Sequence, residues 1–75
     1  MCEEENMTTA KRVGENLKES RKFKGLTQKE VGHFLNMTQQ QYSRFENGVF
    51  ELNYDQILIL CELYEITPNE LFNVR

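Results

Sequence analysis

Cysteine is scarce in this sequence, with only Cys2 and Cys61 among 75 residues. A small secreted domain held together by disulfides usually carries several cysteines. The spacing of these two gives no reason to expect a bridge between them. Neither cysteine has a second Cys or a His nearby that could complete a metal site. We therefore expect two free thiols, with Cys61 as a small buried apolar side chain, and no metal or cofactor.

Long apolar runs are absent as well. No stretch approaches the roughly 20 residues that a membrane helix needs. The acidic first residues lack the basic and apolar parts of a secretory signal. The short length allows one small domain with a thin core. The sequence also shows no nucleophile, base and orienting group at a spacing typical of a catalytic site. We expect a soluble cytoplasmic protein without enzymatic activity, membrane contact or small-molecule ligand.

Charge is distributed unevenly along the chain, whose formal net charge is −3. Residues 1–10 carry three acids and no base, residues 11–44 carry eight bases and three acids, and residues 45–75 carry six acids and one base. An acidic total argues mildly against a nucleic-acid ligand. A basic block inside an acidic chain instead favours one surface that binds an anionic partner. Chance clustering on a solvated helix face is the simpler alternative, so charge alone leaves both interpretations open.

The apolar pattern is helical, and the alternation typical of strands is absent. Val13, Leu17 and Arg21 share one face of a first helix, which we predict over about residues 9–24, ending at Gly25. We predict a flexible acidic tail over residues 1–8 and one domain over residues 9–75.

Capping pairs predict four further helices. In each pair a polar residue at the helix start is followed three residues later by Glu or Gln. The four starting residues are Thr27, Thr38, Asn53 and Thr67. The second helix is expected to end near Asn36, which tolerates left-handed backbone, and the third to run to Asn47 and stop at Gly48. The predicted apolar faces are Val31, Phe34 and Leu35 on the second helix, and Ile57, Leu58, Leu60, Cys61 and Tyr64 on the fourth. Five short helices joined by tight turns predict an all-α bundle.

The second and third helices are separated by only three residues, Asn36 to Thr38. Such a short connection makes the two helices cross steeply, as in a helix-turn-helix. Tyr42 and Phe45 lie on the inner face of the third helix. Its outer face then presents Gln39, Gln40, Ser43, Arg44 and Asn47. Glutamine pairs with adenine and arginine with guanine through two hydrogen bonds each, so this face suits base edges in a major groove.

Residues 13–72 resemble the phage-repressor helix-turn-helix family of the Cro/CI or XRE type. The segment LTQKEVGHFLNMTQQQYSRFENG, residues 26–48, follows the family pattern nearly position for position. The resemblance implies a five-helix, lambda-repressor-like DNA-binding domain. It implies sequence-specific binding of double-stranded DNA by a transcriptional regulator, and we expect a repressor.

The resemblance also implies a role for individual residues. Base-reading positions fall on Gln39, Gln40, Ser43 and Arg44. Phosphate contacts fall on Gln28 and Asn47, and we add Lys24 and Lys29, because the loop at residues 49–52 lacks the cations that many relatives place there. Arg21 and Glu46 match a buried ion pair that ties the first helix to the third. Glu51 in this loop would repel a duplex. We therefore expect modest affinity, or contacts redirected to Lys11, Lys22, Lys24 and Lys29, or another use for Val49 and Phe50.

One such domain covers few base pairs, so we expect a symmetric homodimer on a palindromic operator. With no separate dimerisation domain expected, the candidate contact residues belong to the domain itself: Val49, Phe50, Leu52, Ile59, Ile66 and Phe72. The alternative hypothesis is a protein-interaction module, antitoxin-like or an antagonist of another regulator. The acidic second half of the chain and its loop without cations favour that alternative.

Overall fold

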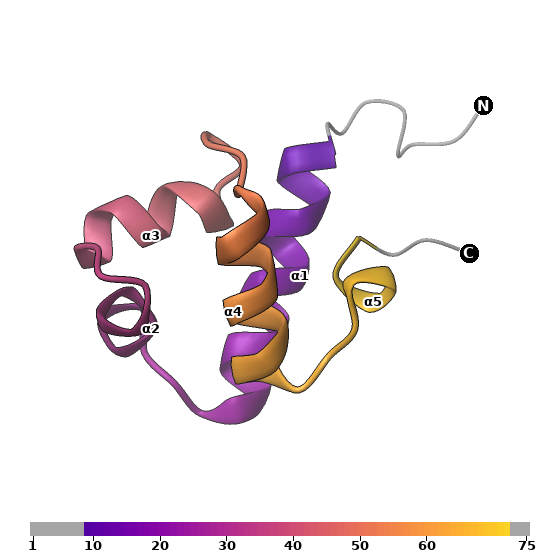
Figure 1. Ribbon diagram of the computed structural model, residues 1–75. Helices are drawn as coiled ribbons and strands as arrows, with labels where there is room; N and C mark the ends of the chain where they lie inside the picture. The colour runs from indigo at the N-terminus through magenta and orange to yellow at the C-terminus, as the bar shows by residue number, and fades with distance from the viewer. Residues whose placement is uncertain (1–8, 73–75) are drawn as a thin grey trace.

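The computed structural model describes residues 9–72, which fold into five α-helices and no strand (Figure 1). The helices are α1 (Thr9–Lys24), α2 (Gln28–Phe34), α3 (Gln39–Glu46), α4 (Tyr54–Tyr64) and α5 (Pro68–Phe72). The predicted all-α fold is confirmed. The predicted flexible tail, residues 1–8, and the last three residues of the predicted domain lie outside the described residues. No helix of the described part is long and apolar enough to cross a membrane.

The starts of α2 to α5 are fixed by the capping pairs read from the sequence. In each pair the side-chain oxygen of the first residue accepts from the backbone N–H three residues on, at 2.8–3.1 Å, and that later side chain accepts from the N–H of the first residue. Left-handed residues end the first four helices, with Gly25, Asn36, Gly48 and Glu65 at φ of 73°, 58°, 77° and 58°. Local chemistry therefore determines most helix boundaries.

The core gathers one apolar face from every helix around α1. Its buried apolar side chains are Val13, Leu17, Val31, Tyr42, Phe45, Leu60, Cys61, Tyr64 and Leu71. Two hydrogen bonds join distant parts of the chain across this core. The hydroxyls of Tyr42 and Tyr64 lie 2.7 Å apart and link α3 to α4. The Asn16 amide donates to the Leu71 carbonyl at 2.7 Å and links α1 to α5.

Two predicted apolar positions lie on the surface instead. Phe34 is 58% exposed and Leu58 is 62% exposed. In α2 the buried side is centred on Val31 and Gly32, because Gly32 packs directly against the backbone of the following turn. Phe34 therefore lies off that side, about 110° from the midpoint between Val31 and Gly32 at 100° per residue. Predicting Phe34 as part of the inner face was wrong.

Candidate nucleic-acid interface

The turn between α2 and α3 brings the two helices together at a steep crossing. In Figure 1, α2 is seen almost end-on while α3 lies across the page. A Cβ atom added to Gly32 would lie 2.9 Å from the Met37 carbonyl oxygen, so the turn packs tightly on α2. Asn36 supplies the left-handed backbone that reverses the chain. This arrangement is a helix-turn-helix.

A buried ion pair holds α3 against α1. The Glu46 carboxylate accepts from Arg21 Nε at 2.7 Å and from Nη2 at 3.3 Å, and the two side chains are 2% and 12% exposed. The Gln28 amide also donates to this carboxylate, at 3.0 Å. Arg21 Nη1 donates to the Leu26 carbonyl at 2.9 Å. One network therefore fixes α1, α2 and α3 relative to one another.

The same network shapes the electrostatics of α3. Glu46 is the only acidic residue of this helix, and it points inward toward Arg21. The hydrogen bond to Glu46 raises the pKa of Arg21. Because the single acid is buried and neutralised, the outer face of α3 presents amides, a hydroxyl and one guanidinium. That face can donate and accept hydrogen bonds without repelling an anion.

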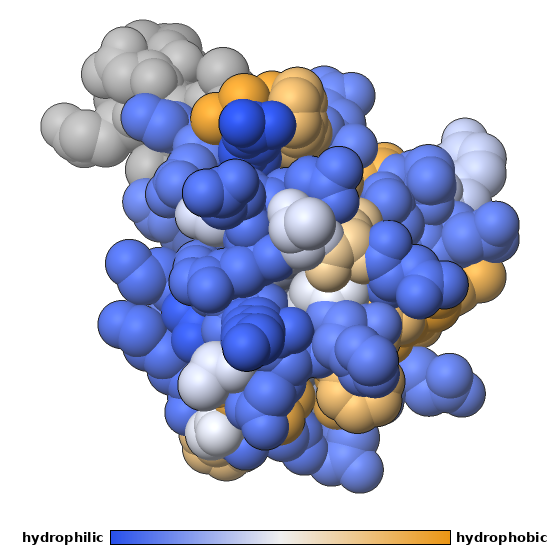
Figure 2. Space-filling view, turned by 90° about the vertical axis from the view of Figure 1, so that its left-hand side faces the viewer, coloured by the Kyte–Doolittle hydropathy of each residue, from blue (hydrophilic) through white to orange (hydrophobic). Residues whose placement is uncertain are grey.

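Five predicted interface residues share one shallow polar hollow on the surface. Its lining residues are Gln28, Gln39, Gln40, Ser43 and Arg44. Figure 2 shows the side of the molecule on which α2 and the start of α3 lie, and hydrophilic side chains dominate it. Asn47 adjoins the group, because its amide donates to the Ser43 hydroxyl at 3.4 Å. The structure therefore brings both the expected base-reading residues and two expected phosphate contacts to one surface.

The two lysines of the predicted phosphate set have different positions. Lys29 is exposed and lines a neighbouring hollow together with Gln39, at the start of α3. Lys24 instead forms an ion pair with Glu65 at the end of α4. Its hydrogen bond lowers the pKa of the Glu65 carboxyl. The structure thus brings Lys29, but not Lys24, to the edge of the polar hollow.

Comparisons with known proteins agree with this geometry. A family model described as a helix-turn-helix domain matches residues 14–75, most of the chain. This chain belongs to the helix-turn-helix domain family. Antitoxin PezA of Streptococcus pneumoniae serotype 4 is 31% identical over 55 residues, which are 73% of this chain and 35% of that protein. The chain thus spans about a third of the length of this curated relative. No solved structure matches.

In this helix-turn-helix domain the loop after α3 contains an arrangement that the sequence did not predict. The Phe50 ring lies under the Arg44 guanidinium, with Arg44 Cζ 5.7 Å from the ring centroid. Phe50 also meets Phe45 edge to face, with ring centroids 6.2 Å apart. No helical periodicity connects residues 44 and 50, because the helix has ended between them. Only the fold of the loop brings them together.

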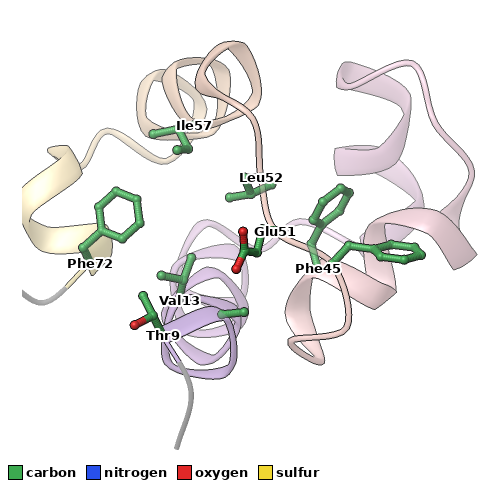
Figure 3. Close-up of a pocket in the computed structure, with 9 residues that line it drawn as sticks. Thr9, Val13, Phe45, Glu51, Leu52, Ile57 and Phe72 are labelled. Atoms are coloured by element: carbon green, nitrogen blue, oxygen red, sulfur yellow. The ribbon is translucent and has the colours of Figure 1, made fainter.

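Behind that loop lies an apolar cavity of about 210 Å³. Figure 3 shows Val13 of α1, Leu52 of the loop and Phe72 of α5 around it, with the Glu51 carboxylate among them. Glu51, in that loop, is the acid expected to repel a duplex. Its side chain contributes to the cavity lining, although the residue as a whole is exposed.

Proposed function

We propose that this protein binds double-stranded DNA sequence-specifically and acts as a transcriptional regulator, a repressor. The observation that carries the proposal is the outer face of α3, which is polar, free of exposed acid and held in place from inside by Arg21 and Glu46. In the proposed complex α3 enters the major groove and α2 crosses the phosphates. Membership of the helix-turn-helix family supports this use of the two helices.

Within this proposal the residues divide into two groups. Gln39, Gln40 and Arg44 read base edges, with Ser43 as a further contact, because their side chains line the polar hollow. Gln28, Lys29 and Asn47 hold phosphates. The Gln28 amide nitrogen has two hydrogens, one directed at Glu46, and the other is available to a phosphate oxygen. Lys24 belongs to the phosphate group only if it first leaves Glu65.

The proposal is tested by selecting bound sequences from a random duplex pool and titrating the selected duplex at two salt concentrations. Arg44→Ala should abolish the preference at one base pair, which is worth about 1–3 kcal/mol of binding free energy. The preferences at the other positions should stay unchanged. Lys29→Ala should weaken binding to all sequences alike and reduce the salt slope by about one. If no sequence is enriched and no duplex binds at low salt, the proposal is wrong.

We propose further that a homodimer binds a palindromic operator whose half-sites lie about one helical turn apart. Val49, Phe50 and Ile59 are 63%, 47% and 40% exposed and remain candidate contacts. Leu52, Ile66 and Phe72 are half-buried against the core and can contribute only their outer edges. Sedimentation of the protein alone and with operator should give a two-to-one complex. A strict monomer in both samples would contradict the dimer.

A second candidate function is recognition of a partner protein, and two observations favour it. One curated relative is named an antitoxin. In addition, α4 exposes Tyr54 (86%) and Leu58 (62%) beside the acids Asp55 and Glu62, a surface that suits an apolar segment carrying basic residues. This function is favoured over the first if the protein binds no DNA even at low salt and forms a stable complex with a partner protein. The Leu58→Lys variant should then fail to form that complex.

A further inference from the structure

The Phe50 ring has a defined place in the interface, and we propose that it is a positioning residue for Arg44. In this proposal the ring supports the Arg44 guanidinium on the outer side of α3 and so strengthens the base preference at the one base pair that Arg44 reads. The inference rests on the proposed DNA-binding function. It goes further by assigning a specificity role to a residue that itself touches no base.

The first support is the contact itself. The guanidinium carbon lies 5.7 Å from the ring centroid, within the roughly 6 Å over which a cation is attracted to an aromatic face. No carboxylate in residues 9–72 pairs with Arg44. The ring is therefore the group that restrains the end of this exposed side chain, which otherwise has many rotamers to lose on binding.

The second support is the rigidity of the platform. After α3 the chain turns at Gly48, whose N–H donates to the Phe45 carbonyl at 3.2 Å, and the Val49 N–H donates to the Arg44 carbonyl at 2.8 Å. This pair of bonds is the Schellman arrangement of a helix end, which directs the following residue back over the last turn. The edge of the Phe50 ring then rests on Phe45, which is only 8% exposed. The ring is thus backed by the core.

The third support is the chemical character of the loop. Residues 49–52 contain no cation, so this loop has no charge with which to hold a phosphate. An aromatic ring beside the recognition helix acts on DNA indirectly, through the arginine it supports. In this proposal the loop makes no phosphate contacts, and it instead orders a base-reading side chain.

The test compares the base preference of Phe50 variants at the position identified by Arg44→Ala. Affinities are measured for all four base pairs at that position and at a distant position of the selected operator. Phe50→Leu keeps apolar bulk but removes the ring, and it should lower the preference for the best base about two- to five-fold, the range that an exposed cation–π contact supports. Phe50→Tyr should retain the preference, and Phe50→Trp should retain or increase it. Phe23→Leu is the matched control, because Phe23 is an 88% exposed phenylalanine on α1 and belongs to none of the proposed contacts.

A double-mutant cycle separates positioning from a merely structural role. In an Arg44→Ala background, Phe50→Leu should cause no further change in preference, because the side chain that it positions is gone. A uniform loss of affinity for all four base pairs, equal in both backgrounds, would overturn the inference while leaving the proposed function intact. A wild-type protein that selects no sequence, or an Arg44→Ala variant with unchanged preference, would refute the proposed base reading and the inference with it. Thermal melts of each variant confirm that differences arise in folded protein.

Discussion

Removing Arg21 tests whether the buried ion pair holds the recognition helix in place. Arg21→Met keeps a long side chain but removes the guanidinium. The Glu46 carboxylate, 2% exposed, would lose both of its bonds from Arg21 and retain only the Gln28 amide. Stranding one charge of a buried pair costs about 3–5 kcal/mol.

That loss is large relative to the stability of the whole domain. At about 0.05–0.15 kcal/mol per residue, a 75-residue chain has an unfolding free energy of about 4–11 kcal/mol. Arg21→Met should therefore remove about a quarter or more of it, as measured by urea denaturation followed by circular dichroism at pH 7. Lys18→Met, which removes an exposed charge from the same helix, is the control.

The double variant Arg21→Met/Glu46→Leu gives the decisive comparison. Replacing both charges with apolar groups removes the stranded carboxylate, so the double variant should recover most of the lost free energy. The reasoning is refuted if Arg21→Met costs less than about 1 kcal/mol. It is also refuted if the double variant is as unstable as the sum of the two single variants, because the charges would then not be coupled.

Two further predictions concern the packing of α3. A Cβ atom on Gly14 would lie 2.3 Å from the Glu46 carbonyl oxygen, so Gly14→Ala should destabilise the fold by about 1–3 kcal/mol or more in urea titrations, whereas the neighbouring exposed Glu15→Ala should change it little. Burial raises the pKa of Tyr64 to about 12 and also raises that of Tyr42, so the folded state keeps protons that the unfolded chain releases near pH 10. The stabilisation is complete below about pH 10 and should be lost as pH rises toward 12, with a slope of up to about 1.4 kcal/mol per pH unit for each group. A Tyr42→Phe/Tyr64→Phe variant that keeps the same alkaline slope would contradict this.

The helices were predictable because their signals are local. Thr38 and Gln41 lie three residues apart, and so do the partners of the other capping pairs, so the sequence alone identifies both members of each contact. The end of α3 at Gly48 follows from the same kind of local chemistry. The polar outer face of α3 was predictable because Tyr42 and Phe45 mark its inner side.

What the sequence could not predict depends on contacts between distant residues. Lys24 and Glu65 are 41 positions apart, and nothing local indicates that this lysine is used to join α1 to α4. The exposure of Phe34 depends on how α2 rotates against the turn, and a helix of seven residues defines its inner face only coarsely. The Phe50–Arg44 contact depends on a loop whose path no periodicity describes.

The residues that hold α3 in place are different from those that face outward, and this has a consequence for how such a domain could change over time. The helix is secured by Thr38 at its start, Gly48 beyond its end and Tyr42 and Glu46 from within. The side chains at positions 39, 40, 43 and 44 take little part in that anchoring, and surface substitutions usually shift stability by no more than about 0.5 kcal/mol. New sequence preferences could therefore be acquired by exchanging these few outward groups, while the scaffold that presents them is inherited unchanged.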